Sequence, residues 1–176
     1  MTRGMARHLR LSRAPGRRNA GLLRAGDWRL PCVLGRGGIS HFKREGDGAT
    51  PAARLHPRAV LYRADRFPRP FTALPLTAIT PDDGWCDDPA DRNYNRPVSL
   101  PYPGRHERLW REDHLYDLLV VLDWNLEPAI KGRGSAIFLH LANPGGAPTE
   151  GCIAVAPSAM HRLLRIMTRR TLIAID

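Results

Sequence analysis

Glycine and proline interrupt this chain so often that a bundle of long helices is excluded. The 176 residues include 16 of each, and both residue types favour turns between short elements. The apolar residues, 43% of the total, therefore fall in short runs. None reaches the roughly 18 consecutive apolar residues that a membrane-spanning helix needs. A chain of this length is sufficient for one domain with a substantial core.

The apolar runs predict strands, because they are short, bounded by turn residues and rich in branched side chains. The mainly apolar character of 115–122 predicts a mostly buried strand, and Pro31 favours an edge position for its strand. Residues 68–103 are expected to be irregular. The predicted strands cover residues 28–34, 58–63, 115–122, 136–141, 152–155 and 171–175.

One helix is expected near the C-terminus, over residues 157–169. Met160, Leu163, Leu164 and Met167 have the spacing of one helical face. Pro157 suits a first turn, and Arg169 and Arg170 would stand near the C-terminal end of the helix dipole. Together the elements predict a mainly β fold, a mixed β-sandwich with one packed helix.

The positive charge of the chain is concentrated in its first third. Residues 1–63 have a balance of +11, whereas residues 64–176 have −1. We therefore expect a basic, flexible segment at 1–21 and one folded domain at 22–176. Such a segment can contact polyanions or anionic lipid, but it lacks the interleaved aromatic residues that would favour nucleic acid. Its leucines are too scattered for the apolar core of an export signal.

One histidine and one cysteine stand where two apolar runs meet a turn-rich loop. His140 is near the end of the first run, Cys152 begins the second, and residues 142–148 are suited to fold the runs back on each other. A thiol beside an imidazole is the minimal equipment for covalent acyl transfer. Gly151 would let the backbone approach closely, leaving amide donors near an oxyanion. The plainer alternative is a buried structural cysteine and a hydrogen-bonded core histidine.

The other candidate groups are less specific. Cys32 lies in an apolar run and is expected in the core, whereas Cys86 adjoins two aspartates that disfavour a thiolate. A zinc site of Cys86, His106 and His114 matches no recognised ligand spacing, so no metal and no organic cofactor is expected. The aromatic group of Trp85, Tyr94 and Trp110 either lines a substrate cleft or packs loops.

The order of several motifs resembles the L,D-transpeptidase catalytic domain, the YkuD-like family, from about residue 22 onward. The motifs are Lys43 with residues 47–51, then 138–140, then Thr149-Glu150-Gly151-Cys152-Ile153. The segments Gly84–Pro89 and Tyr94–Arg96 resemble one branch of that family. The resemblance implies a β-sandwich-like fold and a periplasmic or envelope location.

The family pattern implies roles for individual residues. Cys152 matches the nucleophile, His140 the general base and Gly151 the glycine before the nucleophile. Thr149, Glu150, Trp85 and Tyr94 are the expected substrate-binding residues. Two positions depart from the pattern: Glu150 replaces a histidine, and Ala154 replaces an arginine that supports the site and the substrate carboxylate.

The expected function is therefore acyl transfer between peptidoglycan stem peptides, through a thioester on Cys152 and with no cofactor. Hydrolysis at the same site would instead make the protein an L,D-carboxypeptidase or endopeptidase. A non-catalytic protein that binds polyanions through its basic N-terminus is the alternative from another class. The sequence specifies neither the acceptor amine nor the oligomeric state.

Overall fold

A large curled sheet dominates the computed structural model, which describes residues 7–176. Ten strands pair in the order β6-β15-β1-β2-β3-β14-β13-β12-β7-β8, with both parallel and antiparallel neighbours. The strands are β1 His8–Arg13, β2 Ala20–Ala25, β3 Trp28–Val33, β6 Arg54–Leu55, β7 Pro57–Tyr62, β8 Leu76–Ala78, β12 Leu118–Leu122, β13 Phe138–Leu141, β14 Ile153–Val155 and β15 Leu172–Ile175. The predicted mainly β, mixed fold with a single helix is confirmed.

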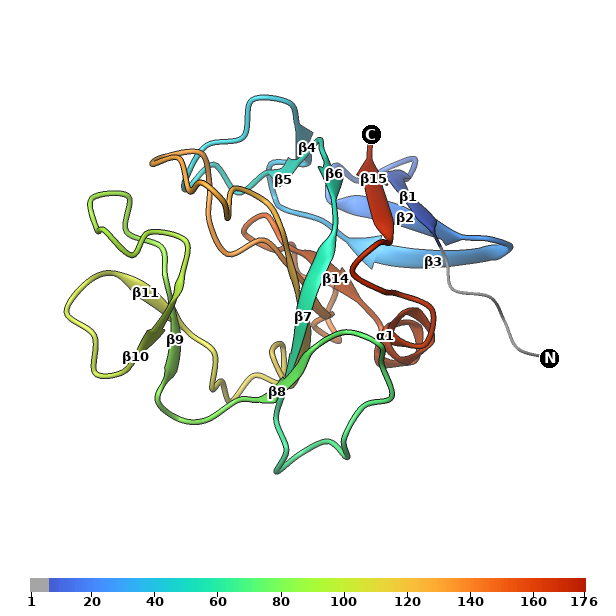
Figure 1. Cartoon of the computed structure of the whole chain (residues 1–176). Coiled ribbons are helices and arrows are strands. Elements are labelled where there is room, and N and C mark those ends of the chain that lie inside the picture. The colour runs from blue at the N-terminus through green and yellow to red at the C-terminus, as the bar shows by residue number, and fades with distance from the viewer. Residues whose placement is uncertain (1–6) are drawn as a thin grey trace.

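Two smaller sheets and one helix complete the structure. A three-stranded sheet contains β9 Asp83–Cys86, β10 Pro97–Ser99 and β11 His106–Arg108, and a two-stranded sheet contains β4 Ile39–Ser40 and β5 Thr50–Pro51. The helix α1 spans Pro157–Leu164. The three-stranded sheet lies on one side of the molecule, and β1–β3 with α1 lie on the other (Figure 1).

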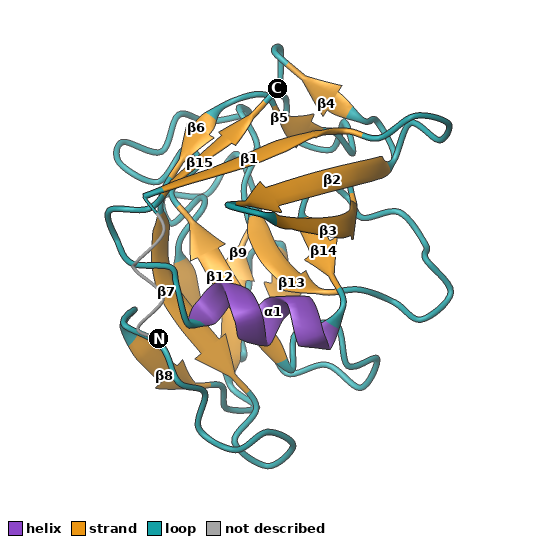
Figure 2. Ribbon diagram, turned by 90° about the vertical axis from the view of Figure 1, so that its right-hand side faces the viewer, coloured by secondary structure: helices purple, strands orange, loops and turns teal. Residues whose placement is uncertain are grey.

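The large sheet curls because its two ends are joined through the chain. Only His56 separates β6 from β7, yet β6 pairs with β15 and β7 pairs with β12. The Nδ1 atom of His56 lies 2.9 Å from the carbonyl oxygen of Thr171, and its amide donates to Asp123 at 2.7 Å. The sheet therefore wraps around one main core, against which α1 packs beside β13 (Figure 2).

The central strands are buried on both faces. Along β12, Leu118, Val120 and Leu122 belong to the main core inside the curl, whereas Leu119 and Val121 belong to a second cluster on the opposite face. Side chains of successive strand residues point to opposite faces, which explains the continuous apolar run in the sequence. The second cluster lies toward the three-stranded sheet and contains Trp85 and Cys152.

Part of the segment expected to be flexible is a strand instead. Residues 8–13 form β1, which lies between β15 and β2. Leu9 and Leu11 are buried in the main core while His8 and Arg10 are exposed. The expected boundary at residue 22 therefore cuts through β2, and the remainder of that expectation, residues 1–6, lies outside the described residues.

Three further expectations need correction. The helix ends at Leu164, so Arg169 and Arg170 lie in a following turn rather than at its end. The strand with Pro31 is not at an edge, although it pairs with β14 only at Cys32 and Val33, which leaves Pro31 without a partner on that side. The region 68–103, expected to be irregular, contains β8, β9 and β10.

Candidate active site

Cys152 lies just before β14, on the face of the sheet opposite the main core. Its neighbour Ile153 pairs with Leu139 and belongs to the main core, whereas Cys152 belongs to the second cluster with Phe138. The thiol donates to the carbonyl oxygen of Ala136 at 3.1 Å, and the amide of Phe138 donates to the sulfur at 3.3 Å. The backbone of β13 thus holds the sulfur in one position.

His140 lies on the same face of the sheet, two residues along β13 from Phe138. Its Nδ1 atom lies 2.8 Å from the carbonyl oxygen of Leu141. Because a carbonyl oxygen only accepts hydrogen bonds, Nδ1 must carry the proton, and the neutral ring then has its lone pair on Nε2. This tautomer is the one that can accept a proton at Nε2.

The two side chains are diagonal neighbours on that face, because His140 pairs with Ala154 and Cys152 precedes it by two residues. Diagonal neighbours have Cα atoms about 7–8 Å apart, a gap that a cysteine and a histidine can bridge by rotation of their side chains. Among residues 7–176, no hydrogen bond joins the thiol to His140 in this arrangement. The two side chains therefore share one face of the sheet.

Burial keeps both groups neutral in the free protein. Desolvation, together with the nearby Glu107, raises the pKa of the Cys152 thiol to about 12, while the hydrogen bond from the Phe138 amide opposes the rise. Desolvation also lowers the pKa of His140 to about 4. The resting site is therefore a thiol and an imidazole rather than a thiolate–imidazolium pair, since burial disfavours the charged form of each.

Gly151 is required by the backbone at this point. Its φ angle is +135°, and a Cβ atom would lie 2.8 Å from the carbonyl oxygen of Ala49. Thr149 stabilises the same turn: its hydroxyl donates to the carbonyl oxygen of Cys152 at 2.6 Å and accepts from the Gly151 amide at 3.2 Å. The Gly151 amide, expected from the sequence to face an oxyanion, is thus already engaged by Thr149.

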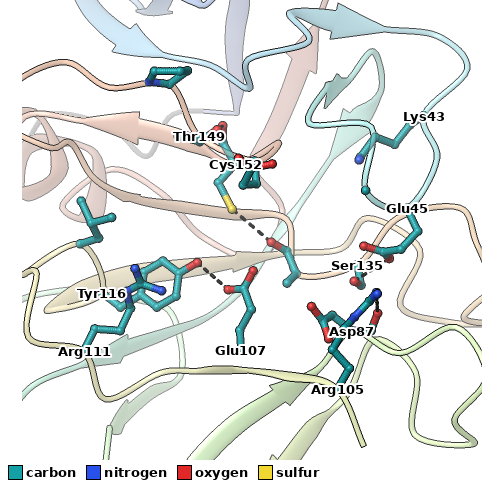
Figure 3. A pocket seen from close by; sticks show the side chains of 15 residues that line it. Lys43, Glu45, Asp87, Arg105, Glu107, Arg111, Tyr116, Ser135, Thr149 and Cys152 are labelled. Atoms are coloured by element: carbon teal, nitrogen blue, oxygen red, sulfur yellow. Dashed lines mark hydrogen bonds and ion pairs between the residues drawn. The ribbon is translucent and has the colours of Figure 1, made fainter.

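A pocket of about 450 Å³ opens over the sulfur (Figure 3). Cys152 and Tyr116 lie on one part of its wall, and Lys43 and Ser135 lie on another. Its charged lining residues come from loops and from the small sheet rather than from the large sheet. They are Lys43, Glu45, Asp87, Arg105, Glu107, Arg111 and Glu150.

Tyr116 connects the pocket wall with the histidine. Its ring packs edge-on against His140 at 5.3 Å and against Phe138 at 5.8 Å between ring centroids. Its hydroxyl donates to Glu107 at 2.6 Å. Neither Tyr116 nor Glu107 was singled out from the sequence, because both come from segments that no motif marks.

Of the expected substrate-binding residues, Thr149 and Glu150 line the pocket and Trp85 and Tyr94 do not. The Glu150 carboxylate forms an ion pair with Arg36, and both side chains are largely exposed. Tyr94 is buried, donating to Glu45 at 2.5 Å, and accepts from the amide of Gly134. The buried Trp85 packs edge-on against Phe138, with centroids 5.2 Å apart.

Asn95, adjacent to Tyr94, is a buried hub that sequence reasoning did not assign to the site. Its Oδ1 accepts from the Trp85 indole and from the Ala136 amide, each at 3.0 Å. Its Nδ2 donates to the carbonyl oxygens of Trp124 and Asn125. Asn95 therefore fixes the backbone of Ala136, the residue whose carbonyl oxygen receives the Cys152 thiol.

The remaining cysteines have structural surroundings. Cys32 lies in the main core, where burial raises its pKa to about 12, and Cys86 is fully buried. His106 pairs with Cys86 across the small sheet, while His114 bonds Asp117 instead. Within residues 7–176 no cluster of three His, Cys, Asp or Glu side chains is suited to hold a metal ion.

A curled mixed sheet with a cysteine at the floor of a polar pocket, and a histidine on the same face, defines a domain equipped for thiol chemistry. The model of the YkuD family, the L,D-transpeptidase catalytic domain, matches residues 18–175. The chain belongs to this family, whose members act on the peptides of peptidoglycan and are typically extracytoplasmic. No curated protein and no solved structure matches the chain significantly.

Among residues 7–176 no helix has the length and apolar character needed to cross a bilayer. The single helix, α1, has eight residues.

Proposed function

We propose that this chain is a cysteine acyltransferase that joins peptidoglycan stem peptides by L,D-transpeptidation. The observation that carries the proposal is the shared position of Cys152 and His140 on one sheet face, with the sulfur lining a pocket of about 450 Å³. The histidine tautomer adds support, because the contact of Nδ1 with the Leu141 carbonyl directs the lone pair to Nε2.

The first half-reaction forms a thioester. Nε2 of His140 takes the proton of the Cys152 thiol once the thiol leaves the Ala136 carbonyl. The sulfur then attacks the carbonyl carbon after the third residue of a tetrapeptide stem, and the C–N bond to the terminal D-residue breaks. The departing nitrogen takes the proton from the imidazolium, so no net charge accumulates. Because Thr149 engages the Gly151 amide, we assign oxyanion stabilisation to the amide of Cys152.

The second half-reaction resolves the thioester. An amine of a second stem attacks the carbonyl carbon, the C–S bond breaks, and a proton from the amine returns to the sulfur through His140. If water replaces the amine, the product is a free carboxylate and the enzyme is a carboxypeptidase or endopeptidase. The cations that line the pocket, Lys43, Arg105 and Arg111, each pair with an acid of the protein, and Ala154 replaces the arginine of the family pattern.

The experiment is incubation of the purified protein with defined tetrapeptide muropeptides, followed by mass spectrometry. Cross-linked product with loss of the terminal residue supports transpeptidation, whereas shortened, uncoupled peptide supports hydrolysis. Intact mass of the protein should show an acyl group on Cys152 during turnover. Full activity in Cys152→Ala would refute the nucleophile assignment.

One observation favours a second function, binding of polyanions. Arg10 pairs with Arg24, and Arg24 pairs with Arg29, so three exposed arginines lie side by side across β1–β3. A row of like charges is unfavourable for the sheet itself and suits a polymer with repeated negative charge. Salt-sensitive binding that disappears in the triple Arg→Gln variant and survives in Cys152→Ala would favour this function.

A further inference from the structure

The pocket contains a carboxyl group, Glu107, that the proposed mechanism does not use. Glu107 lies in the middle of β11, is partly buried, and lines the pocket together with Cys152. Figure 3 shows Glu107 on the same part of the pocket as Cys152, with the Tyr116 hydroxyl beside its carboxyl group. A carboxyl group placed so near a nucleophilic thiol acts directly on its ionisation.

Glu107 is held in place by the same side chain that packs on the histidine. The Tyr116 hydroxyl donates to Glu107 at 2.6 Å, while the Tyr116 ring packs edge-on against His140. The guanidinium of Arg111 lies over the Tyr116 ring, 4.9 Å from its centroid. The carboxyl group, the phenol and the imidazole thus form one packed unit that extends from the pocket wall to His140.

Burial, a hydrogen bond and nearby charges each affect the pKa of Glu107. Burial is the largest influence and raises the pKa of Glu107, whereas the hydrogen bond from Tyr116 lowers it. Asp87 and Glu45 also raise this pKa, and Arg111 lowers it. In turn Glu107 raises the pKa of the Cys152 thiol, against which Lys43 and Arg111 act in the opposite direction.

The pocket lacks a cation for two of its acids. Asp87 pairs with Arg105, and Glu150 pairs with Arg36. Glu107 and Glu45 instead accept hydrogen bonds from neutral hydroxyl groups, and among residues 7–176 neither forms an ion pair. The lining cations are already matched, since Arg111 pairs with Asp113 and Lys43 with Asp47. The charge missing from the pocket is therefore positive.

We propose that Glu107 binds a primary ammonium group of the substrate and thereby couples substrate binding to ionisation of the Cys152 thiol. The inference rests on the proposed function, since it assigns a role at the same site. In the empty pocket burial disfavours ionisation of Glu107, and an ionised Glu107 disfavours a second negative charge on the sulfur. An ammonium on Glu107 supplies the compensating positive charge, so that His140 can remove the thiol proton more readily. In this step the S–H bond breaks and an N–H bond forms at Nε2 of His140, and no other bond changes.

The first test measures alkylation of Cys152 by iodoacetamide from pH 7 to pH 10, with the modified cysteine located by peptide mass mapping. Glu107→Gln retains an acceptor for Tyr116 but removes the charge. We expect alkylation at pH 8 to become about 3–10-fold faster, because a shift of one pKa unit changes the thiolate fraction about tenfold. The same variant should lose transpeptidation at unchanged stability, whereas structural damage that exposes the buried thiol would also lower the free energy of unfolding.

Glu150→Gln is the matched control, because Glu150 lines the same pocket but is neutralised by Arg36. It should leave the alkylation profile unchanged. An alkylation profile of Glu107→Gln equal to that of the wild type would overturn the proposal.

The second test adds a probe ligand, n-propylammonium chloride, against sodium chloride and n-propanol at equal concentration. The ammonium should accelerate alkylation of the wild type saturably, up to the rate of Glu107→Gln, and leave that variant unaffected. Equal acceleration of both proteins, or acceleration by propanol, would show that Glu107 does not mediate the effect.

The last test identifies which peptide supplies the ammonium group. Acylation of Cys152 by a tetrapeptide is followed by intact mass, and aminolysis of the isolated acyl-enzyme is followed separately. Slower acylation in Glu107→Gln assigns the ammonium to the donor stem, and slower aminolysis alone assigns it to the acceptor. Unchanged rates of both steps contradict the proposal. If no stem peptide acylates Cys152, the proposed function fails, and the alkylation experiments still decide the role of Glu107.

Discussion

Cys32 and Cys152 lie on neighbouring strands, and burial raises the pKa of each thiol to about 12. Cys32 pairs with Val155 and points into the main core, where its sulfur fills the space left by Gly21. Cys152 points to the opposite face, where it lines a pocket whose wall includes charged and hydroxyl groups. The resting pKa is thus the same for a core thiol and a candidate nucleophile, and the difference between them lies in what can approach each sulfur.

Replacing each cysteine by alanine should give the largest difference in activity between the two thiols. Cys152→Ala should lower transpeptidation at least about 1,000-fold, because the covalent route is lost. Cys32→Ala should retain activity and lose about 1–2 kcal/mol of stability, since it leaves a small void in the core. Turnover of muropeptides and urea unfolding measure the two effects. An inactive but stable Cys32→Ala protein would contradict the comparison.

Burial of His140 on the pocket side of the sheet should make the stability of the protein depend on pH in acid. Its pKa is lowered from 6.5 to about 4 by burial, so between these values the unfolded chain binds a proton that the folded protein does not. Stability should therefore fall as the pH falls from about 6.5 to 4, by roughly 3 kcal/mol in total.

The measurement is the free energy of unfolding against pH for the wild type and His140→Gln. The difference between the two curves should be flat above pH 7 and slope between pH 6.5 and 4. Activity should persist at pH 6, because the imidazole is still neutral there. Parallel curves for the two proteins would show that His140 is not buried as described.

Asn95 should test how firmly the backbone around the pocket thiol is fixed. Asn95→Ala leaves the Trp85 indole and the Ala136 amide without their acceptor, at a cost of about 2–4 kcal/mol. Asn95→Asp keeps that acceptor but turns a second oxygen toward the two backbone carbonyls that accept from Asn95, so its stability should fall as the pH rises and the buried carboxyl group ionises. Thermal unfolding at low and neutral pH ranks the variants, and Cys152 alkylation should change only where the Ala136 carbonyl moves. An Asn95→Asp protein that is no more stable than Asn95→Ala at low pH would contradict a role for the acceptor.

The smallest effect is expected at Glu150, on the rim of the pocket. Its partner is Arg36, and both side chains are largely exposed, so the ion pair contributes no more than about 0.5 kcal/mol. Glu150→Gln should leave stability and turnover nearly unchanged. A large loss of turnover would mean that the carboxylate contacts the substrate directly.

The central strands were predictable because both of their faces are buried, which makes the apolar run continuous. β1 was missed although its sequence alternates, with Leu9 and Leu11 inward and His8 and Arg10 outward. The prediction of a flexible segment rests on its arginine content, whereas the period-two pattern of its apolar residues indicates a half-exposed strand. The predicted helix is too long because Met167, which lies beyond the end of the helix, is buried in the same core and continues its apolar spacing.

The site was predictable only where its residues are close in sequence. Cys152, His140, Gly151 and Thr149 share one strand–loop–strand unit, and period-two alternation places the first two on one face. Glu107 and Tyr116 reach the same pocket from distant segments, and Asn95 fixes the lining residue Ala136. Their arrival depends on how the three-stranded sheet packs against the large sheet, which no local pattern of the sequence encodes.

The strand order also sets a limit on when the domain can form during synthesis. β15 lies between β6 and β1, so β1 cannot complete its strand pairing until β15 has been synthesised. Until residues 172–175 emerge from the ribosome, one edge of β1 has no neighbour, and a nascent chain with such an edge is prone to pair with other chains. Assistance from a chaperone would then matter most in the interval before the final strand is released.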